Sequence, residues 1–180
     1  AVAALMVVSG YASAQSVTVG YALRELNTGA QEHQTSLSVK SKAYGAFTGD
    51  VGLSAVQKDT TNALTNRTEL GLNYAQELPL GLKGNVRVAH GWKAKSGAEV
   101  TQYYVVEPSV TAKVGATPMS VKLGYRIRNA YSDNVADNST TTRVALGYAF
   151  TNKDSVSLGR DIQRGDGALT QTSLQYTRAF

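Results

Sequence analysis

The sequence predicts an all-β fold: one antiparallel up-and-down transmembrane β-barrel of about ten strands, with eight or twelve as alternatives. Apolar and polar residues alternate from Ser16 onward, and no helical stripe of apolar residues follows residue 15. Such alternation is typical of a strand with one apolar face. The chain also lacks a run of about 18 apolar residues, so it offers no apolar helix for crossing a bilayer.

Each expected strand carries large apolar side chains at every second position, and Pro108 interrupts the sixth. Short connections are expected at 79–81, 115–118 and 151–154, with longer polar ones after the odd strands, an alternation typical of bacterial barrels. The apolar positions of the ten strands, in chain order, are Val17, Val19, Tyr21 and Leu23; Leu37 and Val39; Val51, Leu53 and Ala55; Leu70, Leu72 and Tyr74; Val86, Val88, His90 and Trp92; Tyr104, Val106, Val110 and Ala112; Val121, Leu123, Tyr125 and Ile127; Val144, Leu146, Tyr148 and Phe150; Val156, Leu158 and Ile162; Leu174, Tyr176 and Phe180.

The first 14 residues resemble part of a signal peptide, which leaves 15–180 as the barrel. The segment 1–9 is apolar and uncharged, and Ala12 and Ala14 form the small-x-small arrangement that signal peptidase accepts. A buried first strand or a short helix is the alternative. A signal peptide implies export, to the periplasm or to the outer membrane.

Composition narrows the chemistry further. The chain has no cysteine, which excludes disulfides and thiolate chemistry. Its 180 residues carry a net charge of +5, with an isoelectric point near 9.4 and a mean hydropathy of −0.21. A positive net charge is compatible with nucleic acid, anionic lipid or acidic solutes as partners. The count alone does not choose among these partners, whereas the direction in which the charged side chains point does.

The polar face of the strands would line the barrel interior, and its charges are unequal. The expected inward acids are Glu69, Glu107 and Asp161, and glycines recur on the same face at Gly20, Gly52, Gly71, Gly91, Gly124, Gly147 and Gly159. These glycines either bend the strands or leave room for water. The expected inward cations are Arg24, Lys40, Lys42, Arg87, Lys93, Lys113, Lys122, Arg126, Arg128 and Arg143.

Cations that outnumber their acids favour a hydrated interior that attracts anions, because an unpaired charge is costly in a low-dielectric wall. The alternative is a plugged barrel in which Glu107 and Asp161 close a network with the arginines.

Aromatic residues near the strand ends would form the girdles of a membrane barrel. The expected girdle residues are Trp92, Tyr148, Phe150, Tyr176 and Phe180. The terminal Phe180, preceded by Leu174 and Tyr176, resembles the C-terminal sorting signal that the barrel-assembly machinery reads, although Arg178 departs from it. The expected location is therefore the outer membrane of a Gram-negative bacterium, in contact with lipid and lipopolysaccharide.

Together, the exported start, the small barrel, the inward cations and the terminal aromatic resemble the oligogalacturonate-specific monomeric porin family. The resemblance is architectural and covers Gln15 to Phe180. It implies a monomer that passes acidic sugars through a narrow pore. The family's members look like twelve-stranded barrels with longer chains, whereas this sequence predicts fewer strands. By this resemblance the candidate pore-lining cations are Arg87, Lys113, Lys122, Arg126, Arg128 and Arg143.

The sequence thus predicts a passive channel for small anionic solutes that needs no cofactor and binds no nucleic acid. A closed structural or adhesive barrel and a soluble exported barrel are the alternatives. Catalysis is not expected, since His33 would lie in the first loop and His90 on the lipid face, neither beside a catalytic partner. Metal-ligand clusters and phosphate-binding glycine loops are not found in the sequence.

Overall fold

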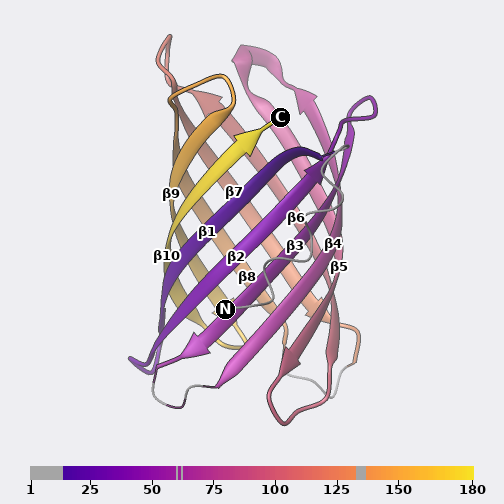
Figure 1. Ribbon diagram of the computed structural model, residues 1–180, viewed down its shortest axis with the longest axis vertical. Helices are drawn as coiled ribbons and strands as arrows, with labels where there is room; N and C mark the ends of the chain where they lie inside the picture. Colours follow the sequence, from indigo (N-terminus) through magenta and orange to yellow (C-terminus); the bar gives the residue numbers. More distant parts are fainter. Residues whose placement is uncertain (1–13, 60, 62, 133–136) are drawn as a thin grey trace.

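The structure is a computed structural model that describes residues 14–59, 61, 63–132 and 137–180. It is a closed antiparallel barrel of ten strands, in which β1 pairs with both β2 and β10 (Figure 1). The predicted fold class and the predicted strand count are confirmed. Among the described residues, no helix is long and apolar enough to cross a membrane.

Neighbouring strands in the sequence are neighbours in the barrel, so each pair is a simple hairpin. A short 3-10 turn, Pro79–Gly81, joins β4 to β5. The strands are β1 (Ala14–Leu26), β2 (Gln31–Ser41), β3 (Phe47–Lys58), β4 (Leu64–Glu77), β5 (Lys83–Lys95), β6 (Thr101–Lys113), β7 (Met119–Ala130), β8 (Ser139–Ala149), β9 (Asp154–Gly165) and β10 (Leu169–Ala179).

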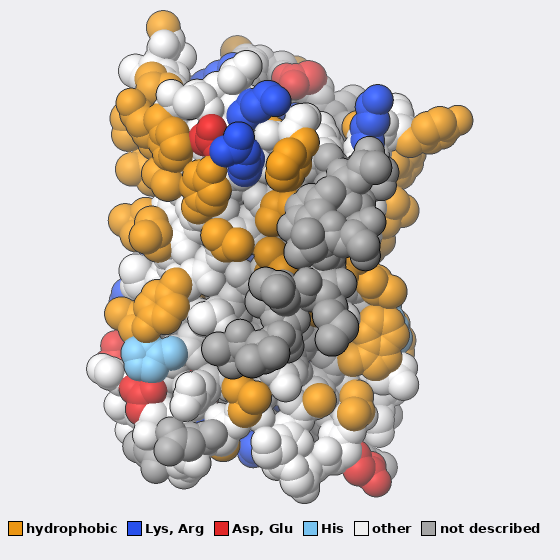
Figure 2. All heavy atoms as spheres, in the orientation of Figure 1, with side chains coloured by type: hydrophobic (Ala, Val, Ile, Leu, Met, Phe, Trp, Pro, Cys, Tyr) orange, Lys and Arg blue, Asp and Glu red, His pale blue; other side chains and the backbone are white. Residues whose placement is uncertain are grey.

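The predicted apolar face points outward, and the polar face points into the barrel. On β1, Val19 and Leu23 are 47% and 51% exposed, whereas Arg24 on the other face is 5% exposed. Hydrophobic side chains are spread over the outer surface in the space-filling view (Figure 2). A barrel with this polarity is inverted relative to a soluble protein, as expected for a barrel surrounded by lipid.

The two ends of the barrel differ in what they carry. The turn end holds the start of β1, the end of β10 and the connections 42–46, 78–82, 114–118 and 150–153. The loop end holds the connections 27–30, 59–63, 96–100, 131–138 and 166–168. The predicted alternation of short and long connections is wrong: only 131–138 is clearly longer, because polar residues such as Thr65 and Asn66 extend the ladder of β4 instead of forming a loop.

The predicted signal peptide lies outside the described residues except for Ala14, where β1 begins.

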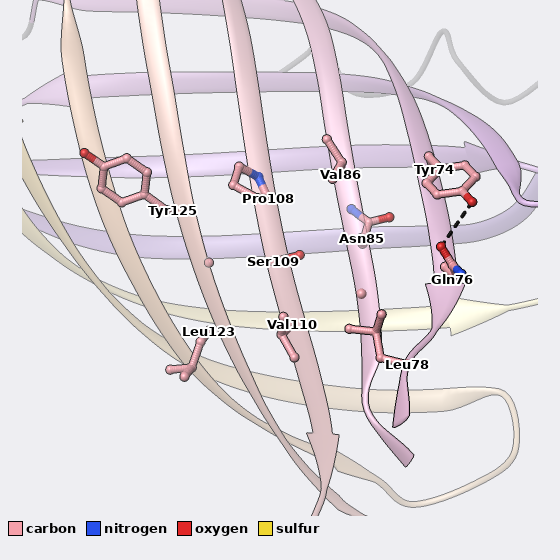
Figure 3. A pocket seen from close by; sticks show the side chains of 12 residues that line it. Tyr74, Gln76, Leu78, Asn85, Val86, Pro108, Ser109, Val110, Leu123 and Tyr125 are labelled. Atoms are coloured by element: carbon pink, nitrogen blue, oxygen red, sulfur yellow. Dashed lines mark hydrogen bonds between the residues drawn. The ribbon is translucent and has the colours of Figure 1, made fainter. Parts of the chain in front are cut away.

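At Pro108, which has no N–H to donate, the β6–β7 pairing skips from Val106↔Ile127 to Ser109↔Gly124. A groove marks this place on the barrel wall, lined mainly by outward side chains that include Tyr74, Val86, Val110, Leu123 and Tyr125 (Figure 3). The groove opens outward, so the candidate functional site has to be sought in the interior.

Candidate functional site in the barrel interior

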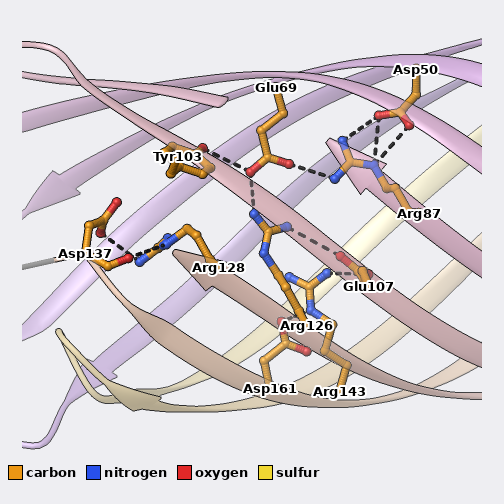
Figure 4. A network of polar contacts seen from close by, with 10 residues as sticks. All are labelled: Asp50, Glu69, Arg87, Tyr103, Glu107, Arg126, Arg128, Asp137, Arg143 and Asp161. Atoms are coloured by element: carbon orange, nitrogen blue, oxygen red, sulfur yellow. Dashed lines mark hydrogen bonds and ion pairs between the residues drawn. The ribbon is translucent and has the colours of Figure 1, made fainter. Parts of the chain in front are cut away.

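A chain of alternating charges crosses the middle of the interior (Figure 4). We call it the charged band, and it consists of Asp50, Glu69, Arg87, Glu107, Arg126, Arg143 and Asp161. These side chains come from β3 to β9, so the band ties most of the barrel wall together through its interior.

Glu69 is the central acid of the band. Its Oε2 accepts a hydrogen bond from Arg87 Nη1 at 2.8 Å, and its Oε1 accepts from Arg126 and, at 3.0 Å, from the Tyr103 hydroxyl. β4 and β7, which carry Glu69 and Arg126, are not adjacent strands, so this contact reaches across the interior. Both side chains are 13% exposed, a burial at which ion pairs are only weakly screened.

The band continues on both sides of Glu69. On one side, Arg87 Nη2 lies 2.7 Å from Asp50 Oδ1. On the other, Glu107 accepts from Arg126 Nη1 at 3.5 Å and from Arg143 Nη1 at 2.8 Å. Arg143 Nε then lies 3.2 Å from Asp161 Oδ2, its direct neighbour in the β8–β9 ladder. Each arginine of the band therefore meets two carboxylates.

Two of the inward glycines make room for these side chains. A Cβ atom on Gly91 would lie 2.3 Å from the ring of Tyr103, and one on Gly71 would lie 2.5 Å from Asp50 Oδ2. Neither glycine has a positive φ, so their backbone does not require glycine. Gly71 and Gly91 therefore have a role that was not predicted from the sequence: they allow close packing of the charged band.

A second group of charges lies toward the loop end. Arg24 Nη1 pairs with Glu32 Oε2 at 2.6 Å, while Lys93 and Arg128 share Asp137 Oδ1 at 2.9 Å each. Arg67 lies among them and repels both Arg24 and Arg128. It has no carboxylate within 4 Å among the described residues, and its buried Nε is without a hydrogen-bond partner there.

Three inward lysines, Lys40, Lys113 and Lys122, lie toward the turn end. All three are exposed although their side chains point into the barrel, and in the described part of the chain none has a carboxylate within 4 Å. Lys40 on β2 and Lys122 on β7 come from opposite sides of the ring and repel one another across the interior. Their exposure indicates that this half of the interior is accessible to water.

The structure thus places the predicted cations, except Lys42, inside the barrel and corrects their pairing. Of the candidate pore-lining cations, Arg87, Arg126, Arg128 and Arg143 have carboxylate partners, whereas Lys113 and Lys122 have none within 4 Å in the part of the chain that the structure describes. Lys42 follows the end of β2 and lies outside the strands. Whether these side chains line an open pore stays a prediction.

Sequence reasoning missed several inward charges. Asp50 lies two positions from the inward Gly52, and Arg67 lies two positions from the inward Glu69. Because every second residue of a strand points the same way, the alternation itself could have identified both as inward. The same alternation along β2 could have identified Glu32 as inward. Asp137 lies outside the strands, where alternation gives no signal. With these acids included, the interior is less lopsided than predicted.

The predicted girdle aromatics fall into clusters at the two ends. At the turn end, the ring of Phe150 stacks with those of Tyr148 and Tyr176, each with a centroid distance of 6.4 Å, and Phe180 follows β10 with 59% exposure. Toward the loop end, the ring of Trp92 packs against that of His90, with a centroid distance of 4.3 Å. Their placement at a membrane surface remains a prediction.

The histidines lie on the outer face. His90 bonds the Tyr131 hydroxyl at 3.1 Å on the outward face, as predicted. His33 was predicted to lie in a loop, which is wrong: it belongs to β2, where its Nε2 lies 3.1 Å from Asp59 Oδ2. The alternation continues past Gln34 and the ladder with β1 includes His33, so the strand starts earlier than its polar residues suggested. Within the described residues, no three His, Asp or Glu side chains are grouped to hold a metal ion.

Comparison with known proteins finds similarity in structure only. No protein-family model and no curated protein sequence matches the chain. The KdgM porin matches over 91% of this chain and 99% of its own, with 12% identity and a TM-score of 0.55. The NanC porin matches over 91% and 100%, with 13% identity and a TM-score of 0.55.

The β-domain of the Bordetella autotransporter BrkA matches about as well, over 93% and 99% of the two chains, with 7% identity and a TM-score of 0.54. The resemblance to the oligogalacturonate-specific porins is therefore confirmed as a resemblance of fold. Because an autotransporter domain shares that fold, the function has to be argued from the interior.

Proposed function

We propose that this chain is an outer-membrane channel of a Gram-negative bacterium that passes small anionic solutes. The observation that carries the proposal is Lys122, a cation inside the barrel wall that is nevertheless exposed and has no carboxylate within 4 Å among the described residues. A charge held inside a low-dielectric wall without a partner has to be hydrated. The outward apolar face supports a location in the membrane.

The charge balance of the interior supports a preference for anions. The charged band holds four carboxylates and three arginines, which leaves a net charge of −1. Lys93 and Arg128 share the one carboxylate of Asp137, which leaves +1 and offsets the band. Among the inward charges named above, the excess positive charge therefore equals that of Lys40, Lys113, Lys122 and Arg67. Walls of low dielectric constant focus such a field and raise the local concentration of anions. The selectivity that the sequence attributed to arginines and lysines together is therefore assigned mainly to the lysines of the turn end.

The shape of the interior supports a passage beside the band. The strands β9, β10, β1 and β2 carry small inward residues, namely Ser157, Gly159, Ser173, Gly20, Ser36 and Ser38. A barrel of eight strands is just filled by its side chains, and ten strands enclose a wider interior. These side chains are smaller than the arginines and glutamates of the charged band, which supports a passage for water and a narrow solute on this side of the interior.

Acidic sugars are the solute class we propose. The KdgM porin has been determined in complex with disordered oligogalacturonate, an acidic oligosaccharide. The unpaired lysines and Arg67 offer charge-assisted hydrogen bonds to carboxylates of this kind. No cofactor or conformational step is required, because transport follows the gradient of the solute.

Planar-bilayer recordings test the proposal. Under a salt gradient the wild-type chain is expected to conduct with a reversal potential that indicates anion preference. The double variant K40Q/K122Q is expected to fold and conduct but to lose most of that preference. R178Q is the matched control, since Arg178 is an outward cation at the same end of the barrel.

Two results would overturn the proposal: no conductance from folded wild-type barrel, or a preference for cations. Unchanged selectivity in K40Q/K122Q would overturn the role given to the lysines while leaving the channel intact.

A closed structural barrel is the second candidate, and the charged band is the observation that favours it. Asp50, Glu107 and Arg128 are 7%, 7% and 4% exposed, so parts of the interior are tightly packed. In that case the wild type would show no conductance, and a variant that breaks the band would show it.

A further inference from the structure

The outer face of β9 carries two arginines in a position where lipid-facing strands normally carry apolar residues. Arg160 and Arg164 share the outward phase of Leu158 and Ile162, which are 55% and 49% exposed. Both arginines are exposed, and among the described residues neither has a carboxylate within 4 Å. Charged residues on a lipid-facing surface are rare and commonly mark a functional site.

Threonines surround the two arginines on both neighbouring strands. In the ladders, Arg160 lies beside Thr172 of β10, and Arg164 lies beside Thr140 of β8. Arg160 Nη1 donates a hydrogen bond to the Thr172 hydroxyl at 2.5 Å. We call this surface the threonine–arginine patch, and it consists of Thr140, Thr142, Arg160, Arg164, Thr170 and Thr172.

The patch lies toward the loop end, which would face the outside of the cell. From Asp154 at the turn end to Arg160 the chain advances six residues, or roughly 15 Å along the barrel axis for a strand tilted as in membrane barrels. Arg164 lies about 10 Å further. Since the apolar band of such barrels is about 25 Å tall, Arg164 reaches the outer interface, and Arg160 can extend its side chain toward it.

We propose that the threonine–arginine patch binds the phosphate groups of an outer-leaflet glycolipid of the lipid A type. Guanidinium groups bind phosphate with paired, charge-assisted hydrogen bonds, and threonine hydroxyls add further donors. The proposal rests on the membrane location in the proposed function but not on conduction. It explains why two outward arginines without carboxylate partners in the described structure occur on a surface that is mostly apolar.

The charges on this side of the barrel fit a lipid phosphate better than a second copy of the chain. A two-fold contact of the patch with itself would place arginine against arginine. The outward acid next to the patch, Glu25, lies beside Thr170 in the β1–β10 ladder and is not within 4 Å of either arginine. The guanidinium groups thus remain available to an external anion.

Binding of lipid A to the full chain in nanodiscs tests the proposal. The probes are diphosphoryl lipid A and its fully dephosphorylated form, titrated against the wild type, R160Q/R164Q and R178Q. R178Q is the matched control because Arg178 is an outward arginine at the opposite end. Loss of charge-assisted contacts is expected to weaken diphosphoryl lipid A binding by at least about tenfold in R160Q/R164Q, with wild-type binding in R178Q.

The heat-modifiable gel shift of the folded barrel confirms that each variant is compared in its native state. The proposal is overturned if R160Q/R164Q binds diphosphoryl lipid A as tightly as the wild type, or if the wild type binds both lipids equally. Loss of a dimer in the double variant would also overturn it, in favour of a protein contact.

Conductance of the same preparations separates this inference from the proposed function. Conducting barrels without phosphate-dependent binding would refute the patch alone. Silent barrels with phosphate-dependent binding would refute the channel alone.

Discussion

Neutralising Glu69 is the most direct test of the charged band. E69Q keeps the shape of the side chain but removes the charge that Arg87 and Arg126 share. Glu69 accepts hydrogen bonds from these two guanidinium groups and from the Tyr103 hydroxyl, and its side chain is only 13% exposed. Removing one partner of a buried pair costs about 3–5 kcal/mol.

The cost at Glu69 is expected at the lower end of that range or below it, because both arginines keep a second acid. Arg87 retains Asp50 at 2.7 Å, and Arg126 retains Glu107 at 3.5 Å. We therefore expect E69Q to lower the free energy of unfolding by about 2–4 kcal/mol.

Urea unfolding in detergent micelles, followed by the heat-modifiable gel shift, measures this loss. E77Q is the matched control. Glu77 also points inward from β4, but its side chain is exposed and no cation lies within 4 Å of its carboxylate among the described residues. A loss in E69Q no larger than in E77Q would refute the structural role of the band.

Two further variants test the packing of the barrel. G91A places a methyl group 2.3 Å from the Tyr103 ring, so it is expected to cost about 1–3 kcal/mol of unfolding free energy. G52A is its control, since the nearest atom to that new methyl group is 3.9 Å away; equal stability of the two variants would contradict the packing role. F150A removes two ring contacts at the turn end and is expected to cost about 1–3 kcal/mol in lipid vesicles, whereas Y44A, at a 90% exposed residue, is expected to cost less than about 0.5 kcal/mol.

Alternation was enough to predict which face of each strand points outward. A side chain on a strand has only two directions, and the apolar phase of β1 from Val17 to Leu23 selects one of them for the whole strand. Neighbouring strands then follow through short hairpins. The same argument could have placed Asp50 and Arg67 inside, since a phase applies to every residue of its strand.

The partners of the inward charges could not be predicted in this way. Glu69 and Arg126 meet because the strands tilt and the barrel closes with a particular register, and the sequence of either strand carries no sign of that register. Asp137 escaped prediction for a different reason, since it acts from a connection where no periodicity exists. Strand limits were also hard to place, because polar residues continue a ladder as readily as they form a loop.

The pairing separates two roles that the sequence had assigned to one set of cations. Neutralising Arg126 or Arg143 would shift the net charge of the interior by the same amount as neutralising Lys122, but it would also leave Glu107 and its neighbours short of a partner. Such a variant changes packing and potential together, so altered selectivity would not identify its cause. Lys40 and Lys122 have no carboxylate within 4 Å in the described structure, although Lys40 is the ladder neighbour of Asp50, so their neutralisation changes the potential while the ion pairs of the band stay intact. Stability is therefore expected to follow the arginines, and ion selectivity the lysines.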